Sequence, residues 1–159
     1  MSKDKNETAT VTMLQKTDRF YEAPEVAEIA KELIPQFHQH LQNVPILYFF
    51  DGGKMKDSAT MSKRSDKEIF ISGYKFIMQV NKAVWSDLKD DQRIALVDHE
   101  LQHAYVSPEG ETSIIDHDIE EFTAIVRRRG LWNKRLGEFS MAVGEQLDAF
   151  KEVAKSKAA

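Results

Sequence analysis

Residues 90–105 read DDQRIALVDHELQHAY, and two periodic patterns overlap in this stretch. Apolar residues recur at intervals of three and four, which predicts an amphipathic helix with one buried side. His99 and His103 project from nearly the opposite side of that helix. We therefore expect a helix, with Asp87 or Asp90 as its N-cap, that packs its apolar arc into a core and presents two imidazoles outward. The arc comprises Ile94, Val97, Leu101, Ala104 and Tyr105, where we expect the helix to end.

The order His-Glu-x-x-His gives this helix a specific chemistry. Residues four apart lie on one helix face, so both imidazoles can reach a single metal ion. Glu100 lies one step round the helix, where its carboxylate can touch a metal-bound water without binding the metal. Zinc lowers the pKa of such a water to about 7, and a neighbouring carboxylate can then accept its proton. We interpret His99 and His103 as metal ligands and Glu100 as a general base.

A third ligand has to come from elsewhere in the chain, because a catalytic zinc commonly has three protein ligands. The chain has no cysteine, so the candidates are His, Glu and Asp. The segment DHDIEEF, residues 116–122, offers them, and we expect it to begin a second helix that ends at Gly130. On such a helix, His117 and Glu121 share the side away from the apolar residues. His117 is the preferred third ligand, and Glu121 or Glu120 is the alternative.

The elements before this helix follow from the remaining patterns. Ala23 and Pro24 predict the start of an N-terminal helix, because proline is tolerated at the first helical position. His40 falls on the apolar arc of that helix, so we expect it to pack rather than to bind metal. Three or four strands are expected in a small, mostly antiparallel sheet. The candidates are 46–50, 58–64, 74–80 and, more weakly, 69–72, and we expect residues 69–80 to supply an exposed sheet edge.

A last helix is expected from about Leu131 to Ala154. Its apolar residues recur at helical spacing, and we expect them to pack in the core. The pattern as a whole predicts an α+β fold: an N-terminal helix, a small sheet, the His-Glu-x-x-His helix and two further helices. Residues 1–18 are expected to form a flexible arm and residues 19–155 a single domain. The apolar residues of the last helix are Trp132, Leu136, Phe139, Val143, Leu147 and Phe150.

Composition excludes several classes of protein. The chain has 159 residues, of which 42% are hydrophobic, and this is too apolar for a disordered chain. The lack of cysteine excludes a disulfide scaffold and a cysteine nucleophile. The net charge of −4 argues against a dedicated nucleic-acid binder, and no apolar stretch is long enough to cross a membrane. The N-terminus lacks the apolar core of a secretion signal, so we expect a cytoplasmic protein.

Together these residues resemble the putative phage metallopeptidase family, which is related in pattern to SprT-like proteins and other short zincins. The resemblance extends over roughly residues 20–135. It rests on two motifs in a fixed order and on the segments that flank them. These segments are Ala23-Pro24-Glu25, Ile46–Phe50, Trp85–Leu96, His99–His103, His117–Phe122 and Arg128–Trp132.

The resemblance implies a minimal zincin-like core and a zinc-dependent peptidase that acts on proteins or peptides in the host cytoplasm. His99 and His103 would bind Zn²⁺, and Glu100 would be the catalytic base. His117 matches the position where SprT-like proteins place a later ligand histidine, although Asp118 stands where those proteins commonly have glycine.

Two other readings remain open. One is a non-catalytic zinc-binding protein of the same fold that binds or inhibits a host protein. The other is a DNA-associated protease similar to SprT proteins, for which Arg127, Arg128 and Arg129 could contact phosphates. The acidic net charge instead favours a role for these arginines at the C-terminal end of a helix.

Overall fold

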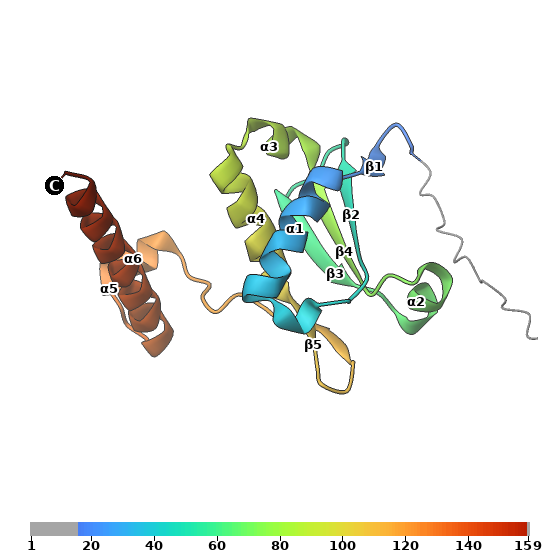
Figure 1. Ribbon diagram of the computed structural model, residues 1–159. Coiled ribbons are helices and arrows are strands. Elements are labelled where there is room, and N and C mark those ends of the chain that lie inside the picture. The colour runs from blue at the N-terminus through green and yellow to red at the C-terminus, as the bar shows by residue number, and fades with distance from the viewer. Residues whose placement is uncertain (1–15, 159) are drawn as a thin grey trace, which may run out of the picture. The chain divides into compact units, whose positions relative to one another are not determined.

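The computed structural model describes residues 16–158 and separates into two compact units (Figure 1). The boundary lies between Ile115 and Asp116. The first unit holds the sheets and helices α1–α4, and the second holds α5 and α6. Most of the predicted N-terminal arm, residues 1–15, lies outside the described residues. The single domain over residues 19–155 stays a prediction.

The first unit is built on a four-stranded sheet with the strand order β1-β2-β4-β3. The outer pairs are antiparallel, whereas the central pair β2–β4 is parallel. The predicted small, mostly antiparallel sheet is confirmed, and three of the candidate strands correspond to β2, β3 and β4. The strands are β1 (Phe20–Glu22), β2 (Ile46–Asp51), β3 (Ala59–Lys63) and β4 (Phe76–Asn81).

The weaker strand prediction at residues 69–72 is wrong, because these residues belong to helix α2 (Asp66–Ser72). Local capping explains the helix. The Ser65 hydroxyl accepts a hydrogen bond from the Glu68 backbone N–H, and the Glu68 carboxylate accepts one from the Ser65 backbone. Gly73 then ends the helix in the left-handed conformation, at φ 78°. Residues 69–80 therefore supply no exposed edge, since β4 lies between β2 and β3.

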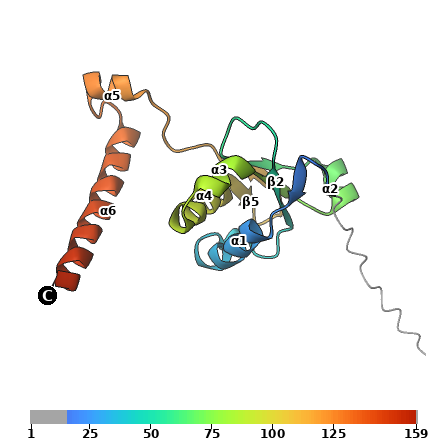
Figure 2. The same cartoon turned by 90° about the horizontal axis from the view of Figure 1, so that it is seen from above.

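Helices α1 (Pro24–Phe37) and α4 (Asp90–His103) lie on the same face of the sheet (Figures 1 and 2). Proline occupies the start of α1, as predicted. A short helix, α3 (Lys82–Asp87), leads from β4 to α4. Alternate residues of the strands point toward the two long helices and form the core. The largest buried side chains are Trp85, Phe50, Phe76, Leu41, Met78 and Leu101.

Helix α4 is shorter than predicted at its C-terminal end. It ends at His103, and Ala104 begins the hairpin of β5 (Ala104–Val106) and β6 (Thr112–Ile114). Gly110, at φ 86°, forms part of the turn. Lys89, rather than either aspartate, is the N-cap, and the Gln92 side chain accepts a hydrogen bond from its backbone N–H. The predicted arc is buried at Val97, Leu101 and Ala104, whereas Ile94 and Tyr105 are exposed.

The second unit contains α5 (Thr123–Arg129) and α6 (Lys134–Ala158). Two helices after α4 were predicted, and Gly130 ends the first of them as expected. The predicted start at Asp116 is wrong, because residues 116–122 are not helical and Phe122 is the N-cap. The predicted core packing of the last helix is also wrong. Leu136 is buried, whereas Phe139, Val143, Leu147 and Phe150 are all exposed.

Among the described residues, no helix combines the length and the hydrophobicity needed to cross a lipid bilayer.

Candidate metal site

Helix α4 divides its side chains between the core and the surface. Val97 and Leu101 are fully buried, and Glu100 is only 5% exposed. His99 is exposed and His103 is half-buried on another side of the helix. Their rings are stacked edge to face, with centroids 5.1 Å apart. The predicted arrangement of the two histidines on one helix face is therefore present.

His117 completes a three-histidine group. One ring nitrogen each from His99, His103 and His117 lies within 4.8 Å of the other two. His117 reaches this position from the irregular segment that follows β6, not from a helix. His117 therefore lies close to the other two histidines, as expected. It does not lie on the helix from which this position was predicted.

The β5–β6 hairpin fixes the orientation of His103. The Nδ1–H of His103 donates a hydrogen bond to the Ile115 carbonyl oxygen, 2.5 Å away. The backbone N–H of Ile115 donates in turn to the carbonyl oxygen of His103. A proton on Nδ1 leaves Nε2 as the nitrogen with a lone pair, which is the tautomer that a metal ligand requires.

Glu100 extends from α4 toward β3. Burial raises the pKa of its carboxyl above the ordinary value, and the nearby carboxylate of Asp57 raises it further. The neighbouring His103 imidazole and a hydrogen bond from the Met61 backbone N–H act in the opposite direction. A carboxylate in this environment takes up a proton more readily than one in water, which suits a general base.

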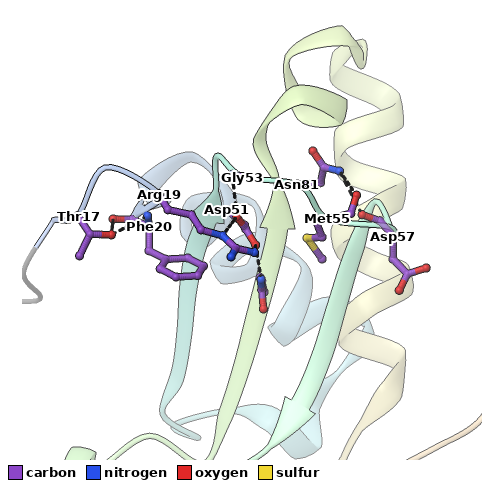
Figure 3. Close-up of polar contacts among 9 residues, drawn as sticks. Thr17, Arg19, Phe20, Asp51, Gly53, Met55, Asp57 and Asn81 are labelled. Carbon is purple, nitrogen blue, oxygen red and sulfur yellow. Dashed lines mark hydrogen bonds and ion pairs between the residues drawn. The ribbon is translucent and has the colours of Figure 1, made fainter.

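The loop that carries Asp57 is anchored at both ends (Figure 3). At its start, the buried carboxylate of Asp51 accepts hydrogen bonds from Arg19, Gly53 and Gln79. At its end, the Asn81 side-chain amide donates to the carbonyl oxygens of Met55 and Asp57. A Cβ at residue 53 would lie 2.6 Å from Nε of Arg19, so any other residue there would push the arginine away from Asp51.

Two further histidines hold α4 from the side of α1. His38 is 2% exposed, and its Nε2–H donates to the Asp98 carboxylate over 2.6 Å. The Nε2–H of His40 donates to the Ala104 carbonyl oxygen, just after the end of α4. His40 lies in the short 3-10 helix Gln39–Leu41 and is exposed, so its predicted place on the apolar arc of α1 is wrong. Neither histidine belongs to the three-histidine group in the described structure.

The alternative third ligands lie in the second unit. Glu121 already accepts two hydrogen bonds, from the Phe122 backbone N–H and from Nε1 of Trp132. Glu120 follows the half-buried Ile119 in the same irregular segment and is exposed. Within residues 16–158, the metal-ligand group found contains His117 and neither glutamate.

Sequence reasoning missed the residues that surround the histidines. The Ile115 carbonyl oxygen, the Met61 backbone N–H and Asp57 reach the site through the register of the hairpin and the position of β3. No sequence signal identifies a backbone group of this kind. The pair His38–Asp98 spans 60 positions, and no local pattern in the sequence indicates it.

Fold and histidine group together define the class: a zincin-like α+β protein with a group that can hold a metal ion. The profile of the putative phage metallopeptidase family matches residues 18–150, and the chain belongs to this family. Membership supports a peptidase, and hence a hydrolase, role, with proteins or peptides as substrates. No curated protein and no solved structure matches the chain.

Proposed function

We propose that this protein is a zinc-dependent peptidase in which His99, His103 and His117 bind the ion and Glu100 is the general base. The observation that carries the proposal is the three-histidine group together with the buried Glu100, which lies on α4 between His99 and His103. A surface helix with two unrelated histidines would need neither a third histidine nor a buried carboxylate beside them.

The donor set suits zinc. Three imidazole nitrogens and an open position form a common catalytic zinc site. The ligand atoms of a tetrahedral zinc lie about 3.3 Å apart, given metal–nitrogen distances of about 2.0–2.1 Å. The three nitrogens, all within 4.8 Å of one another, would need only small side-chain movements to reach this separation. A bound zinc ion supplies a Lewis acid that polarises a carbonyl and acidifies water.

The chain's own residues supply the proton transfers. A carboxylate oxygen of Glu100 accepts a proton from the attacking water and later delivers it to the nitrogen of the leaving amine. The Met61 N–H and the buried surroundings hold that carboxylate in one place. The hydrogen bond between His103 and the Ile115 carbonyl would leave the Nε2 lone pair for the ion.

Metal content tests the ligand assignment. The wild type, purified without added metal or a histidine tag, should contain about one zinc per chain by elemental analysis. His103→Ala and His117→Ala should each lose it, whereas Gln102→Ala, an exposed neighbour on α4, should retain it. Loss with His103→Ala alone would move the third ligand to Glu120 or Glu121. A wild type that binds no zinc even after reconstitution would refute the proposal.

Cleavage of an unstructured protein such as casein, or of a peptide library, tests the role of Glu100. Glu100→Gln should keep zinc and lose turnover by a factor of about 10² or more. Gln102→Ala should cleave like the wild type. Full activity of Glu100→Gln would refute Glu100 as the base. A zinc-loaded wild type that cleaves nothing, and binds a host protein equally well with Glu100→Gln, would favour the non-catalytic reading.

A further inference from the structure

Helix α6 carries an apolar stripe that its own unit does not cover. Phe139, Val143, Leu147, Phe150 and Val153 form this stripe, and their exposed fractions lie between 45% and 64%. At 100° per residue they lie within one third of the helix circumference. In the 25 residues of α6, Leu136 is the one residue that is buried. A helix of this length with its apolar side in water gains little stability from packing.

The spacing of the stripe is that of a helix that pairs with another helix. Val143 and Phe150 are seven residues apart, and Phe139 and Val153 precede and follow them by four and three residues. These four positions are a and d sites of a heptad repeat. The apolar faces of α1 and α4 are already buried in the first unit. Among the described helices, α6 is thus the one whose apolar side has this spacing and is exposed. A second copy of the chain would supply a second α6 helix with the same stripe.

The exposed area is sufficient for a dimer. Five side chains, each about half exposed, present on the order of 500 Å² of apolar surface on one copy. A pair of such helices would bury about 1,000 Å² in total, which is the lower bound for a specific interface. A patch of this size matches the largest apolar patch on a typical monomer, and such a patch is often functional.

The charge pattern permits self-pairing. Between Phe139 and Leu147 the single charged residue is Glu145, which lies on the side of the helix opposite the stripe. The ion pairs of α6, Lys134–Glu138 and Asp148–Lys151, are formed within the helix. Over this span two stripes can therefore meet without bringing like charges together.

We infer that the protein forms a homodimer through the stripe on α6, with the α6 helix of a second copy as the occupant. This inference is independent of the proposed peptidase chemistry, because no member of the three-histidine group lies on α6.

Sedimentation velocity of the full-length protein over a wide concentration range tests the inference. The wild type should sediment with twice the 18.3 kDa mass of one chain at high concentration and dissociate on dilution. Leu147→Lys should be monomeric throughout. Met141→Lys is the matched control, because Met141 is an exposed apolar residue of the same helix outside the stripe. It should dimerise like the wild type. Circular dichroism confirms that both variants are folded.

Disulfide trapping provides a second test, which needs no destabilising charge. The chain contains no cysteine, so Val143→Cys introduces a single thiol at the middle of the stripe. Mild oxidation should give a covalent dimer, whereas Met141→Cys should give little. A wild type that stays monomeric at every concentration would overturn the inference and mean that the stripe covers its own chain or another protein. Equal cross-linking of the two cysteine variants would overturn it as well.

Discussion

His38 and Asp98 form a hydrogen bond of 2.6 Å that joins the end of α1 to the helix carrying the candidate metal ligands. The histidine is buried, whereas the aspartate is half-exposed and directly precedes His99. The bond therefore connects the core of the first unit to the part of α4 that carries His99 and His103. On the same side of α4, His40 donates a hydrogen bond to the carbonyl oxygen of Ala104, the residue that follows His103.

Removal of the Asp98 carboxylate should destabilise the fold, because it leaves a buried N–H of His38 without its acceptor. Asp98→Ala should lower the free energy of unfolding by about 1–3 kcal/mol. Asp98→Asn should recover most of the loss, since its amide oxygen can accept the same hydrogen bond. Urea denaturation measures both variants, and Gln39→Ala is the exposed control. Equal stability of Asp98→Ala and the wild type would show that the bond contributes nothing.

The carboxylate of Asp51 should make the protein sensitive to acid. Hydrogen bonds from Arg19, together with those from Gly53 and Gln79, lower its pKa from 3.8 to about 2. Because the folded-state pKa lies below the unfolded one, the stabilisation is complete above about pH 4 and is lost as the pH falls toward 2.

The measurement is urea denaturation of the metal-free protein at pH 6 and pH 3. Asp51→Asn should be less stable than the wild type at pH 6, and the difference should shrink at pH 3. Asp87→Asn, which changes an exposed carboxylate, should show no such trend. A constant difference between Asp51→Asn and the wild type at both pH values would contradict the assignment.

Local patterns predicted the parts of the site that lie on one helix. The relative positions of His99, Glu100 and His103 follow from helical geometry alone, and Glu100 is the one of the three that is buried. His117 was selected correctly as a neighbour, but from a helix that does not form, because residues 116–122 are irregular. The ligand preference of zinc identified histidine as the residue type, whereas the path of the chain after β6 determines where His117 lies.

The remaining features depend on pairings between distant segments. Strands β2 and β4 are parallel neighbours although β3 and α2 lie between them in the sequence. No periodicity in the sequence predicts this pairing. A capping box made α2 a helix where its apolar residues suggested a strand. The apolar pattern of α6 predicted the helix correctly but not which surface covers it, because periodicity identifies an apolar side and not its partner.

Zinc should stabilise the protein through the three histidines. A ligand that binds only the folded state, at about a hundred times its dissociation constant, adds about 2.7 kcal/mol to the free energy of unfolding. The Tm of the metal-free wild type should therefore rise on addition of zinc, and a chelator should reverse the change. His117→Ala should show a much smaller rise, and His40→Ala, outside the group, a rise like that of the wild type. An undiminished zinc response in His117→Ala would contradict ligation by this residue.

Glu100, the proposed general base, should lower the stability of the metal-free fold. Burial raises the pKa of its carboxyl, so the ionised form is less favourable in the folded state than in the unfolded state. This cost is absent below the unfolded-state pKa, and it is complete above the raised folded-state pKa. Glu100→Gln keeps the shape of the side chain and can still accept the hydrogen bond from the Met61 N–H.

The metal-free Glu100→Gln variant should therefore be more stable than the metal-free wild type at pH 8, and the gain should fade as the pH approaches 4. Urea denaturation at the two pH values measures the difference. Glu109→Gln is the matched control, because Glu109 is an exposed carboxylate in the hairpin turn and should show no gain at either pH. If Glu100→Gln were instead less stable than the wild type at pH 8, the ionised carboxylate would be satisfied by its surroundings. The burial of Glu100 would then not destabilise the metal-free protein.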